Sequence, residues 1–401
     1  MDLIIHKASQ ILTFEGDQLQ VITDADIVIR NGIITQLKKL KSIPRKAKVI
    51  SAQNCVVLPG FVDPHTHLVF KSLRSGEFFM RLEGLSYKEI LSRGGGILST
   101  VHELRETTEK ELYELARERL LAMLKWGTTT VEVKSGYGLS WKHELKMLRV
   151  INKLREDLKQ KITVIPTFMG AHAIPPDKTL DGYTKELIEM MIPQVSQKKL
   201  AEFVDVFCEN FVFPPPVAER ILNTAKQYRL KTKIHADEVE QSGGAELASK
   251  LNCISAEHLN NASMAGLRAL KKSNVVCVLL PGTSLFLKAH KKPPVEHMRK
   301  LGLTVALGTD FNPGTCPIYQ MPIIITLGCL LYGLTPQEAL KAATINSAYS
   351  LGLGQKIGLV REGYTADLLI LNTPNYQDLF FQLGTNLVRT VIKQGQVSLS
   401  N

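Results

Sequence analysis

The sequence predicts an α/β protein: a (β/α)8 TIM-like barrel with a small composite β-sandwich domain formed by both termini. The middle of the chain contains eight short, apolar, β-branched segments that alternate with helix-like sequence, which is typical of a parallel sheet covered by helices. The two ends of the 401-residue chain instead contain consecutive strand patterns. We therefore expect residues 58–356 to form the barrel, and residues 1–57 and 357–401 to form the composite domain.

The N-terminal segment predicts six short strands separated by turns, at 2–6, 11–13, 19–22, 26–30, 33–37 and 47–51. Asn31-Gly32 lies between two of them, and Asn-Gly accepts the positive φ of a type I′ hairpin turn. Near the C-terminus, strands are expected at 366–371 and 388–397, the second with a turn at Gln394-Gly395. Because the cost of loop closure grows slowly with loop length, these distant segments can pair into one composite sheet.

The barrel strands are predicted at 60–67, 128–134, 162–168, 203–208, 231–235, 253–258, 275–280 and 304–308. Helix-like sequence follows them, for example at 109–125 and 214–228. The longest apolar run, 322–334, is too short to span a bilayer and predicts a buried helix. In barrels of this type the active site gathers at the carboxyl ends of the strands.

Histidines and an aspartate stand at those ends. His65 and His67 close the first predicted strand, His235 the fifth and His258 the sixth, and Asp310 follows the eighth. An isolated pair of strand-end histidines is about as often an ordinary polar feature as part of a metal site. Imidazoles and a carboxylate on separate strands, however, predict a metal site with an open position. The remaining histidines, His6, His102, His143, His290 and His297, are interpreted as surface or structural residues.

Metal-assisted hydrolysis is the chemistry that this pattern favours. The predicted ligands are His65, His67, His235 and Asp310. A divalent ion there would make a water molecule acidic enough to react near neutral pH, and Asp310 could hold its proton. His258 could hydrogen-bond a carbonyl oxygen as charge builds on it, and Glu238 could pass a proton to the leaving nitrogen. The alternative for Glu238 is a helix cap, for which the neighbouring Asp237 is better suited.

The amino-acid composition limits which binding partners and which cellular compartment we expect. The chain has 49 Lys and Arg against 38 Asp and Glu, a net charge of +11, but its basic clusters contain no interleaved aromatic residues. We therefore expect no nucleic-acid partner, and a basic surface that mildly favours anionic small molecules. The six cysteines form no CxxC pair, and the first fifteen residues show no signal-peptide pattern. A cytoplasmic protein without disulfides or membrane association is expected.

Longer motifs surround the strand ends: DPHTHLVF at 63–70, EF at 77–78, RLEGLSY at 81–87, GGGI at 94–97, EVKSGYGL at 132–139, GAHAIP at 170–175, HADE at 235–238, AEHL at 256–259 and TDFNPGT at 309–315. The pattern of strand-end residues resembles the amidohydrolase superfamily. The motifs resemble, more narrowly, its imidazolonepropionase family, over essentially the whole chain.

The resemblance implies the hydrolysis of 4-imidazolone-5-propanoate to N-formimidoyl-L-glutamate, a step of L-histidine degradation. It implies one zinc or iron ion per chain on the four predicted ligands, and a possible homodimer. The residues matching the family's substrate contacts are Arg74, Tyr137, His172, Glu238, Asn312, Gly314 and Thr315. Arg74 suits the substrate carboxylate because guanidinium donors form a bidentate fork. Gly136 and Gly314 permit close approach of the backbone to a small ligand.

Two positions depart from a simple match. The family usually has glycines between the His-X-His strand and the arginine, whereas this chain has Lys71-Ser72-Leu73. Because the following motifs keep register, we still expect Arg74 to bind the carboxylate. Lys134 ends a strand where superfamily members can carry a carbamylated lysine that bridges two metals. The surrounding motif favours instead a hydrogen-bonding or structural lysine.

Two other functions remain open from the sequence. A purine- or pyrimidine-type deaminase of the same superfamily would use the same histidines, glutamate and aspartate, but would not need a carboxylate-binding arginine. Arg74 together with Tyr137 therefore discriminates the two enzymes. A metal-free scaffold that kept the barrel and lost the chemistry is the third possibility, and the presence of all four ligand residues argues against it.

Overall fold

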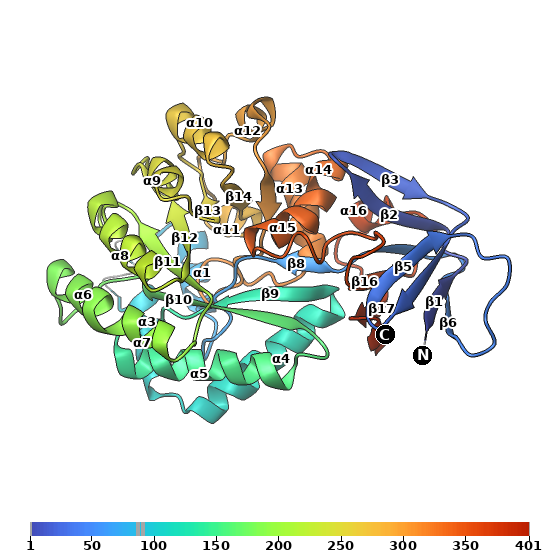
Figure 1. Ribbon diagram of the computed structural model, residues 1–401. Coiled ribbons are helices and arrows are strands. Elements are labelled where there is room, and N and C mark those ends of the chain that lie inside the picture. Colours follow the sequence, from blue (N-terminus) through green and yellow to red (C-terminus); the bar gives the residue numbers. More distant parts are fainter. Residues whose placement is uncertain (1, 86–88, 90–92, 401) are drawn as a thin grey trace.

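The computed structural model describes residues 2–85, 89 and 93–400, so residues 86 and 87 of the motif at 81–87 lie outside the described part. Its strands form three sheets of eight, four and six strands. The eight-stranded sheet and its helices occupy one side of the molecule, and the strands of the two chain ends occupy the other, where both termini lie (Figure 1). The predicted fold class is thereby confirmed.

Eight parallel strands form the barrel, one in each predicted segment. They are β8 (Phe61–Asp63), β9 (Thr128–Lys134), β10 (Thr163–Ala171), β11 (Phe203–Cys208), β12 (Lys231–Ala236), β13 (Ser255–His258), β14 (Val276–Leu279) and β15 (Val305–Leu307). Strand β8 ends at Asp63, so His65 and His67 follow the strand instead of lying in it as predicted. Each strand pairs with the next. The ring closes just beyond β8 and β15, where Thr66 pairs with Phe311 and Asp310 N–H donates to the carbonyl of His65 (3.0 Å).

The sides of a barrel strand carry different residue types. In β9 every residue is buried. Val131 and Val133 belong to the large apolar core, which also contains residues of the surrounding helices. Because successive side chains alternate across a strand, Glu132 and Lys134 point the other way, into the barrel, where both are fully buried. The interior of the barrel therefore contains charged groups close to the strand ends.

Helices cover the outside of the barrel (Figure 1). They are α1 (Ser75–Leu82), α3 (Ile97–Glu106), α4 (Glu109–Lys125), α5 (Trp141–Asp157), α6 (Leu180–Glu186), α7 (Ile192–Gln197), α8 (Pro215–Gln227), α9 (Gly244–Lys250), α10 (Met264–Lys272), α11 (Pro281–Phe286), α12 (Val295–Leu301), α13 (Met321–Tyr332), α14 (Pro336–Ala342), α15 (Ile345–Ser350) and α16 (Asp378–Phe381), with a π-helical turn at Leu187–Met191.

The sequence explains where several of these helices begin and end. Thr108 caps α4 by accepting from Glu111 N–H, and Thr335 with Glu338 forms a capping box at α14. The predicted buried helix is α13, which is largely buried and ends at Gly333 (φ 70°). In the described part of the chain, no helix has the length and apolar character needed to cross a membrane.

The chain ends form two sheets that face each other. The four-stranded sheet has the order β5 (Ile33–Lys38), β4 (Asp26–Arg30), β1 (Leu3–His6), β6 (Lys48–Ser51). The six-stranded sheet has the order β18 (Gln396–Ser400), β17 (Val388–Lys393), β16 (Leu368–Leu371), β7 (Val56–Pro59), β2 (Gln10–Glu15), β3 (Gln18–Ile22). Antiparallel pairing of β16 with β7 joins the two chain ends, as the sequence predicted.

The six-stranded sheet connects the two parts of the molecule. Val57 and Ile370 belong to the core between the terminal sheets, whereas Leu58 and Leu369 belong to the core of the barrel. Alternation along each strand thus packs one face of the sheet on each core. Strand β7 runs across the boundary predicted after residue 57, so the two domains share this strand.

Two hairpin turns meet where the chain ends come together. Asn31 (φ 49°) and Gly32 (φ 79°) confirm the predicted turn, and Gln394 (φ 49°) and Gly395 (φ 73°) form a similar one. A Cβ on Gly32 would lie 2.9 Å from the carbonyl oxygen of Gln394. Glycine is therefore needed at position 32 both for its positive φ and for this close approach.

Replacing Asp367 with asparagine should destabilise the composite domain. Lys393 Nζ lies 2.5 Å from Asp367 Oδ2, and both side chains are 2% exposed. Removing the carboxylate leaves a buried ammonium without its counter-charge, which typically costs about 3–5 kcal/mol. Denaturant titration should show a loss of this size in the free energy of unfolding.

The exposed pair of Glu296 with Lys300 provides the control. Glu296→Gln should leave the free energy of unfolding close to that of the wild type, because water screens exposed pairs. Equal losses in the two variants would contradict the importance of burial for the Asp367 pair.

Candidate active site

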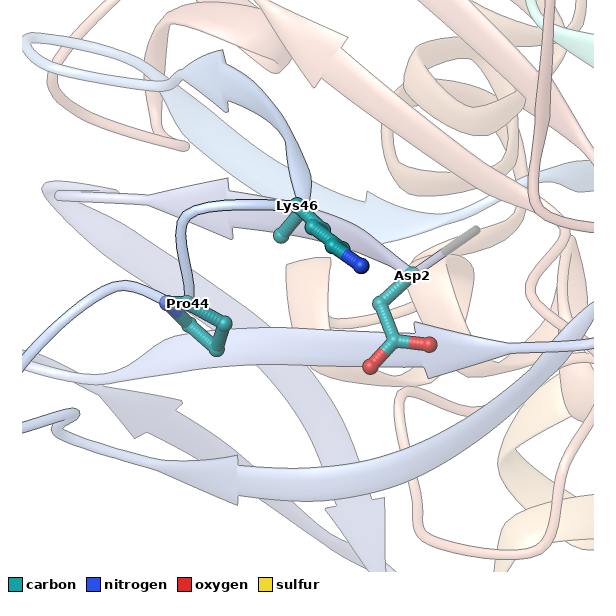
Figure 2. A pocket seen from close by; sticks show the side chains of 4 residues that line it. Asp2, Pro44 and Lys46 are labelled. Atoms are coloured by element: carbon teal, nitrogen blue, oxygen red, sulfur yellow. The ribbon is translucent and has the colours of Figure 1, made fainter.

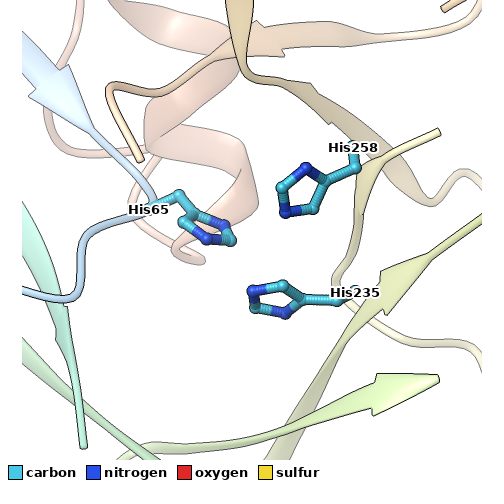
Figure 3. Close-up of side chains that lie close together, drawn as sticks. All are labelled: His65, His235 and His258. Atoms are coloured by element: carbon cyan, nitrogen blue, oxygen red, sulfur yellow. The ribbon is translucent and has the colours of Figure 1, made fainter. Parts of the chain in front are cut away.

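The predicted site residues all lie at the carboxyl ends of barrel strands or in the loops that follow them. His65 and His67 follow β8, His235 lies in β12, His258 ends β13 and Asp310 follows β15. The side chains of His65, His235 and His258 point toward one another from three different strands (Figure 3). The barrel thus brings together residues that are far apart in the sequence.

The four predicted ligands form one buried cluster. His65 Nε2 lies 3.2 Å from His67 Nε2, and Asp310 Oδ1 lies 3.4 and 3.7 Å from these two atoms. The ring of His235 is 4.6 Å from that of His65 and 5.5 Å from that of His67 between centroids. Each of the four residues is at most 3% exposed. Nitrogen and oxygen atoms that face one another at these distances suit a shared cation.

The electrostatics of the cluster also fit a cation. Burial, together with the neighbouring imidazoles, lowers the pKa of His67 well below its ordinary value, so this ring is neutral. Burial disfavours charge on His65, but the Glu257 and Asp310 carboxylates raise its pKa to about 9. Contacts with His65, His258 and Thr283 hold the pKa of Asp310 below its ordinary value despite burial. A metal ion can replace the proton that this arrangement attracts to His65.

His258 stands beside the same cluster. Its ring lies 5.1 Å from that of His235 and 5.6 Å from that of His65. The nitrogens of these three histidines are close enough together to hold an ion, as are those of His65 and His67 with Asp310. Geometry therefore allows His258 as a ligand as well as the substrate-facing group that the sequence predicted.

Two carboxylates behind the histidines were missed by the sequence analysis. Glu257 Oε2 contacts His65 Nδ1, and Asp205 Oδ2 lies 3.1 Å from His235 Nδ1. Both acids are fully buried. Each occurs inside a predicted apolar strand, and a charged residue at such a position is the signal that could have revealed them.

Lys134 is surrounded by these acids. Its Nζ lies 2.7 Å from both Glu132 Oε2 and Asp205 Oδ2, and 3.1 Å from Glu257 Oε2. Burial opposes its charge, but the three carboxylates raise the pKa of Lys134 well above its ordinary value. An ammonium held in this way does not favour carbamylation, so the structure supports the structural role over a metal-bridging one.

Asp310 is held directly by Thr283, and its neighbour Thr309 is held by Asp63. Thr283 Oγ1 donates to its Oδ2 (2.5 Å). Asp63 Oδ1 and Oδ2 accept from the backbone N–H and hydroxyl of Thr309, at 3.0 and 2.6 Å. Asp310 (φ 51°) and His258 (φ 70°) both have left-handed backbone conformations. Such strain is typical of functional sites that the surrounding structure over-determines.

Glu238 faces the site, whereas its neighbour Asp237 caps a helix. The side chain of Asp237 accepts from four successive backbone N–H groups, at 242–245. Glu238 Oε2 lies 3.4 Å from His258 Nε2. Burial, together with the carboxylates of Asp310 and Glu209, raises the pKa of Glu238 to about 8. Of these two acids, Glu238 is therefore the candidate proton carrier, as predicted.

Glu209 is a further residue that the sequence analysis missed. Its Oε1 accepts from the backbone N–H groups of Glu238 and Val239, at 2.8 and 2.9 Å. Burial raises the pKa of Glu209 to about 7. The contacts fix the backbone from which Glu238 extends.

Arg74 lies against the loop that follows Asp310. Its backbone N–H donates to the carbonyl of Pro313 (2.7 Å). Its guanidinium donates to Thr100 Oγ1 (2.8 Å) and lies 3.0 Å from Glu77 Oε1. A Cβ on Gly314 would lie 1.7 Å from Arg74 Nη2, so glycine at 314 leaves room for the guanidinium in its present position.

The predicted aromatic contacts line the site beside the predicted metal ligands. The ring of His172 stacks on that of His67 at 4.8 Å, and Tyr137 lies 5.3 Å from His172. Burial lowers the pKa of His172 to about 3 and raises that of Tyr137 above its ordinary value, so both are neutral. Gly136 (φ 119°) lets the backbone approach His172, because a Cβ there would lie 2.9 Å from His172 Nδ1.

Asn312 organises its own loop. Its Oδ1 accepts from the backbone N–H groups of Gly314 (2.9 Å) and Thr315 (2.7 Å). Its Nδ2 donates to the carbonyl of Asp310 (2.7 Å) and to Thr315 Oγ1 (2.8 Å). The side chain thus connects a metal-ligand candidate to the loop on which Arg74 packs.

The departure at Lys71-Ser72-Leu73 lies on the surface next to this region. All three residues are exposed. Arg119 holds the preceding segment, since its guanidinium donates to the carbonyls of Leu68 and Phe70 at 2.9 and 2.5 Å. The backbone of the segment is therefore fixed independently of the residues at 71–73.

The histidines predicted to be surface or structural lie away from the cluster. His102, His290 and His297 are exposed. His6 contacts Asp26 in the composite domain (2.7 Å), and His143 contacts Ser140 (2.9 Å). A surface pocket of the composite domain, lined by Asp2, Pro44, Lys46 and Ala47, contains none of the predicted site residues (Figure 2).

Comparison with known sequences gives a consistent result. The chain matches the Amidohydrolase family over residues 56–398. It is 42% identical to the imidazolonepropionase of Geobacillus sp. (strain WCH70), over 98% of this chain and 97% of that protein. It is 43% identical to the imidazolonepropionases of Clostridium tetani (99% and 98%) and Symbiobacterium thermophilum (99% and 97%).

Solved structures with the same fold are more distant in sequence. A triazine hydrolase variant superposes with a TM-score of 0.79 at 18% identity, covering 100% of this chain and 95% of that one. A zinc-bound adenosine deaminase from Xanthomonas campestris gives 0.76 at 18% identity (100% and 93%). A guanine deaminase from C. acetobutylicum gives 0.73 at 18% identity (99% and 100%). These likenesses establish the fold alone.

Metal content of two alanine variants should separate the ligands from their neighbours. His67→Ala removes a predicted ligand, so the purified protein should contain clearly less than one metal ion per chain by elemental analysis. His258→Ala should retain the ion and lose activity. Loss of metal in His258→Ala with retention in His67→Ala would assign the ligand role to His258 instead.

Proposed function

We propose, from the premise that this chain belongs to the imidazolonepropionases of the amidohydrolase family, that it hydrolyses 4-imidazolone-5-propanoate to N-formimidoyl-L-glutamate. The reaction opens a cyclic amide: the bond from the carbonyl carbon to the ring nitrogen breaks, and water supplies hydroxyl to carbon and hydrogen to nitrogen. The observation that carries the proposal is that Arg74 packs against the loop that follows Asp310. This loop lies next to a cluster suited to a catalytic metal.

Substrate binding is assigned to both sides of the metal cluster. Arg74 binds the propanoate carboxylate, and Gly314 leaves the space that its guanidinium needs. The neutral side chains of Tyr137 and His172 offer hydrogen bonds to the ring, together with Glu238. The backbone of Gly314 and the side chain of Thr315, held by Asn312, complete the proposed binding loop.

One metal ion per chain, zinc or iron, is the proposed cofactor. His65, His67, His235 and Asp310 would hold it, and their mixture of imidazole and carboxylate suits either metal. When bound, the ion would lower the pKa of a water molecule toward neutrality and so supply hydroxide at working pH.

The protein groups divide the proton transfers among themselves. Asp310 accepts a proton from the attacking water, since its lowered pKa keeps the carboxylate ionised. His258, kept neutral because burial lowers its pKa, donates a hydrogen bond to the carbonyl oxygen as negative charge develops there. Glu238 is protonated near neutral pH and delivers its proton to the leaving nitrogen. Water thereby replaces the amide nitrogen at the carbonyl carbon.

A deaminase is the second candidate reaction, because adenosine and guanine deaminases share the fold. Their 18% identity carries no assignment of substrate to this chain. The partly buried guanidinium of Arg74 suits a substrate with a carboxylate, which purine and pyrimidine bases lack. The 42–43% identity to full-length imidazolonepropionases also supports the hydrolase reaction.

We further propose that the protein works in the cytoplasm as a homodimer. All six cysteines are free, which suits a reducing compartment. The homodimer follows from family membership, and an elution volume of a monomer at micromolar concentration would contradict it.

The proposed reaction is tested by following the absorbance of imidazolonepropanoate after addition of the purified protein, with and without prior chelation. Chelator-sensitive loss of absorbance, with formimidoylglutamate as the product, is expected. Metal-loaded protein that shows no turnover of this compound would contradict the proposed substrate. Release of ammonia from an amino-heterocycle would then support the deaminase.

Replacing Arg74 with alanine should weaken substrate binding more than it slows the chemical step. Loss of a charge-assisted contact costs about 1.5–3 kcal/mol, so KM should rise roughly 10- to 100-fold, with metal content unchanged. Steady-state kinetics and elemental analysis on the same preparation measure both effects.

Lys71→Ala is the matched control for Arg74, because Lys71 is an exposed cation three residues away. It should change KM by less than about twofold, as exposed charges contribute little. A larger effect in Lys71→Ala than in Arg74→Ala would move the carboxylate-binding role to Lys71.

Glu238 should make the reaction depend on pH. A carboxyl group whose pKa is raised to about 8 is protonated below that pH and loses its proton as the pH rises through it. Proton donation should therefore fall on the alkaline side, and kcat/KM should fall with it. If the bound cation stabilises the carboxylate, this fall should occur at a lower pH. Glu238→Gln should reduce kcat by about 10²–10⁴-fold and remove this alkaline limb.

The exposed residue Glu240 supplies the control for Glu238, and Glu240→Gln should keep the wild-type profile. An unchanged alkaline limb in Glu238→Gln would assign that limb to another group and contradict the role of Glu238 as proton donor.

A further inference from the structure

We propose that Lys134, Asp205 and Glu257 form a positioning unit that fixes the ring orientation and tautomer of His65 and His235 before the metal binds. The inference rests on the proposed metal site, but not on the identity of the substrate. It assigns a role to buried charged residues that take no part in the proposed proton transfers.

The unit connects two metal-ligand candidates through single oxygen atoms. Glu257 Oε2 contacts His65 Nδ1 and lies 3.1 Å from Lys134 Nζ. Asp205 Oδ2 lies 3.1 Å from His235 Nδ1 and 2.7 Å from Lys134 Nζ. The Lys134 ammonium therefore sits between the carboxylates that contact the two rings, and it fixes both of them at once.

A second lysine holds the far side of the same group. Lys233 Nζ lies 2.8 Å from Glu257 Oε1 and 3.0 Å from Glu132 Oε1. It also donates to the carbonyl of Pro64 (2.8 Å), the residue that precedes His65. The Glu257 carboxylate is thus held at both oxygens, and the backbone beside His65 is tied to the same cluster.

These groups have little freedom to rearrange. Lys134, Lys233, Glu132, Asp205 and Glu257 are all completely buried. Their contacts join four different barrel strands, β9, β11, β12 and β13. Moving one charge would leave another buried charge without its partner, at a cost of several kcal/mol. The positions of the carboxylates are therefore set by the fold.

The position of each carboxylate dictates which ring nitrogen carries the proton. A carboxylate beside Nδ1 favours the neutral tautomer with hydrogen on Nδ1, which leaves the Nε2 lone pair free for a metal. Neither Nδ1 contact has the angle of a straight hydrogen bond, although each carboxylate oxygen lies next to the ring nitrogen. The unit supports His65 and His235, which its carboxylates contact at Nδ1, whereas the carboxylate beside His67 is that of Asp310, at Nε2 (3.7 Å).

Zinc affinity measured by chelator competition tests the proposal, with the full-length protein stripped of metal and titrated with Zn²⁺. Loss of a carboxylate that orients a ligand histidine typically lowers metal affinity about 10–100-fold. Asp205→Asn and Glu257→Gln should show losses of this size. Glu132→Gln is the matched control, since Glu132 is equally buried in the same cluster and contacts both lysines, but within the described part of the chain it forms no ion pair with a histidine. Its zinc affinity should stay within about threefold of wild type.

Equal losses of affinity in all three variants would overturn the proposal and assign the cluster to packing alone. Unchanged affinity in Asp205→Asn and Glu257→Gln would overturn it as well. A wild-type chain that binds zinc but does not hydrolyse imidazolonepropanoate would contradict the proposed substrate and leave this comparison valid. A wild-type chain without a zinc site would contradict both.

The tautomers can be measured in the wild-type protein, so the proposal stays testable if a variant does not fold. Nitrogen-15 NMR of the metal-stripped chain should show hydrogen on Nδ1 of His235, and on Nδ1 of His65 at a pH above its pKa of about 9, where that ring is neutral. Neutral rings with hydrogen on Nε2 at both positions would overturn the proposal.

Discussion

Charged side chains buried inside a closed barrel must find their partners there, and the functional site depends on this constraint. Three carboxylates and two lysines fill the interior just behind the histidines. Pairs of this kind are weak contributors to stability, because desolvation offsets much of their attraction. They do, however, penalise any other register of the strands that carry them. The same contacts that satisfy the buried charges therefore place the proposed metal ligands.

The site extends outward from this base in layers. The histidine cluster lies on the buried acids. Asp310 accepts a hydrogen bond from Thr283 and has a left-handed backbone conformation. Beyond the ligands, the Asn312 loop and Arg74 pack on each other through Gly314. Each layer is fixed by the one beneath it, which gives a small substrate a preorganised site.

The sequence predicted the parts of the fold that follow from local patterns. All eight barrel strands could be read from apolar, β-branched segments, and the ligand candidates from polar residues at their ends. The pairing of the chain ends was also predicted, from the strand patterns at both ends and from the slow growth of closure cost with loop length. Strand β10 extends beyond its predicted end to Ala171, the residue before His172. Local propensity does not reveal this extension.

The contacts between strands could not be predicted in this way. Glu132, Asp205 and Glu257 were included in predicted strands, but their roles depend on which side chains meet across the barrel interior. That depends on strand order and stagger, which a single sequence does not display. Asn312 is a similar case: it was predicted as a substrate contact, and its side chain is engaged in organising the loop. Its proposed role at the substrate therefore rests on the loop that it holds.

The central claim is that one metal ion binds on preorganised histidines above an intact buried ion cluster. Anomalous diffraction from crystals of the zinc-loaded protein tests this claim most directly. The account predicts a single anomalous peak in contact with His65, His67, His235 and Asp310, with Lys134 unmodified and paired with its carboxylates. Two peaks bridged by a modified Lys134, or a single peak bound by His258 in place of His67, would contradict it.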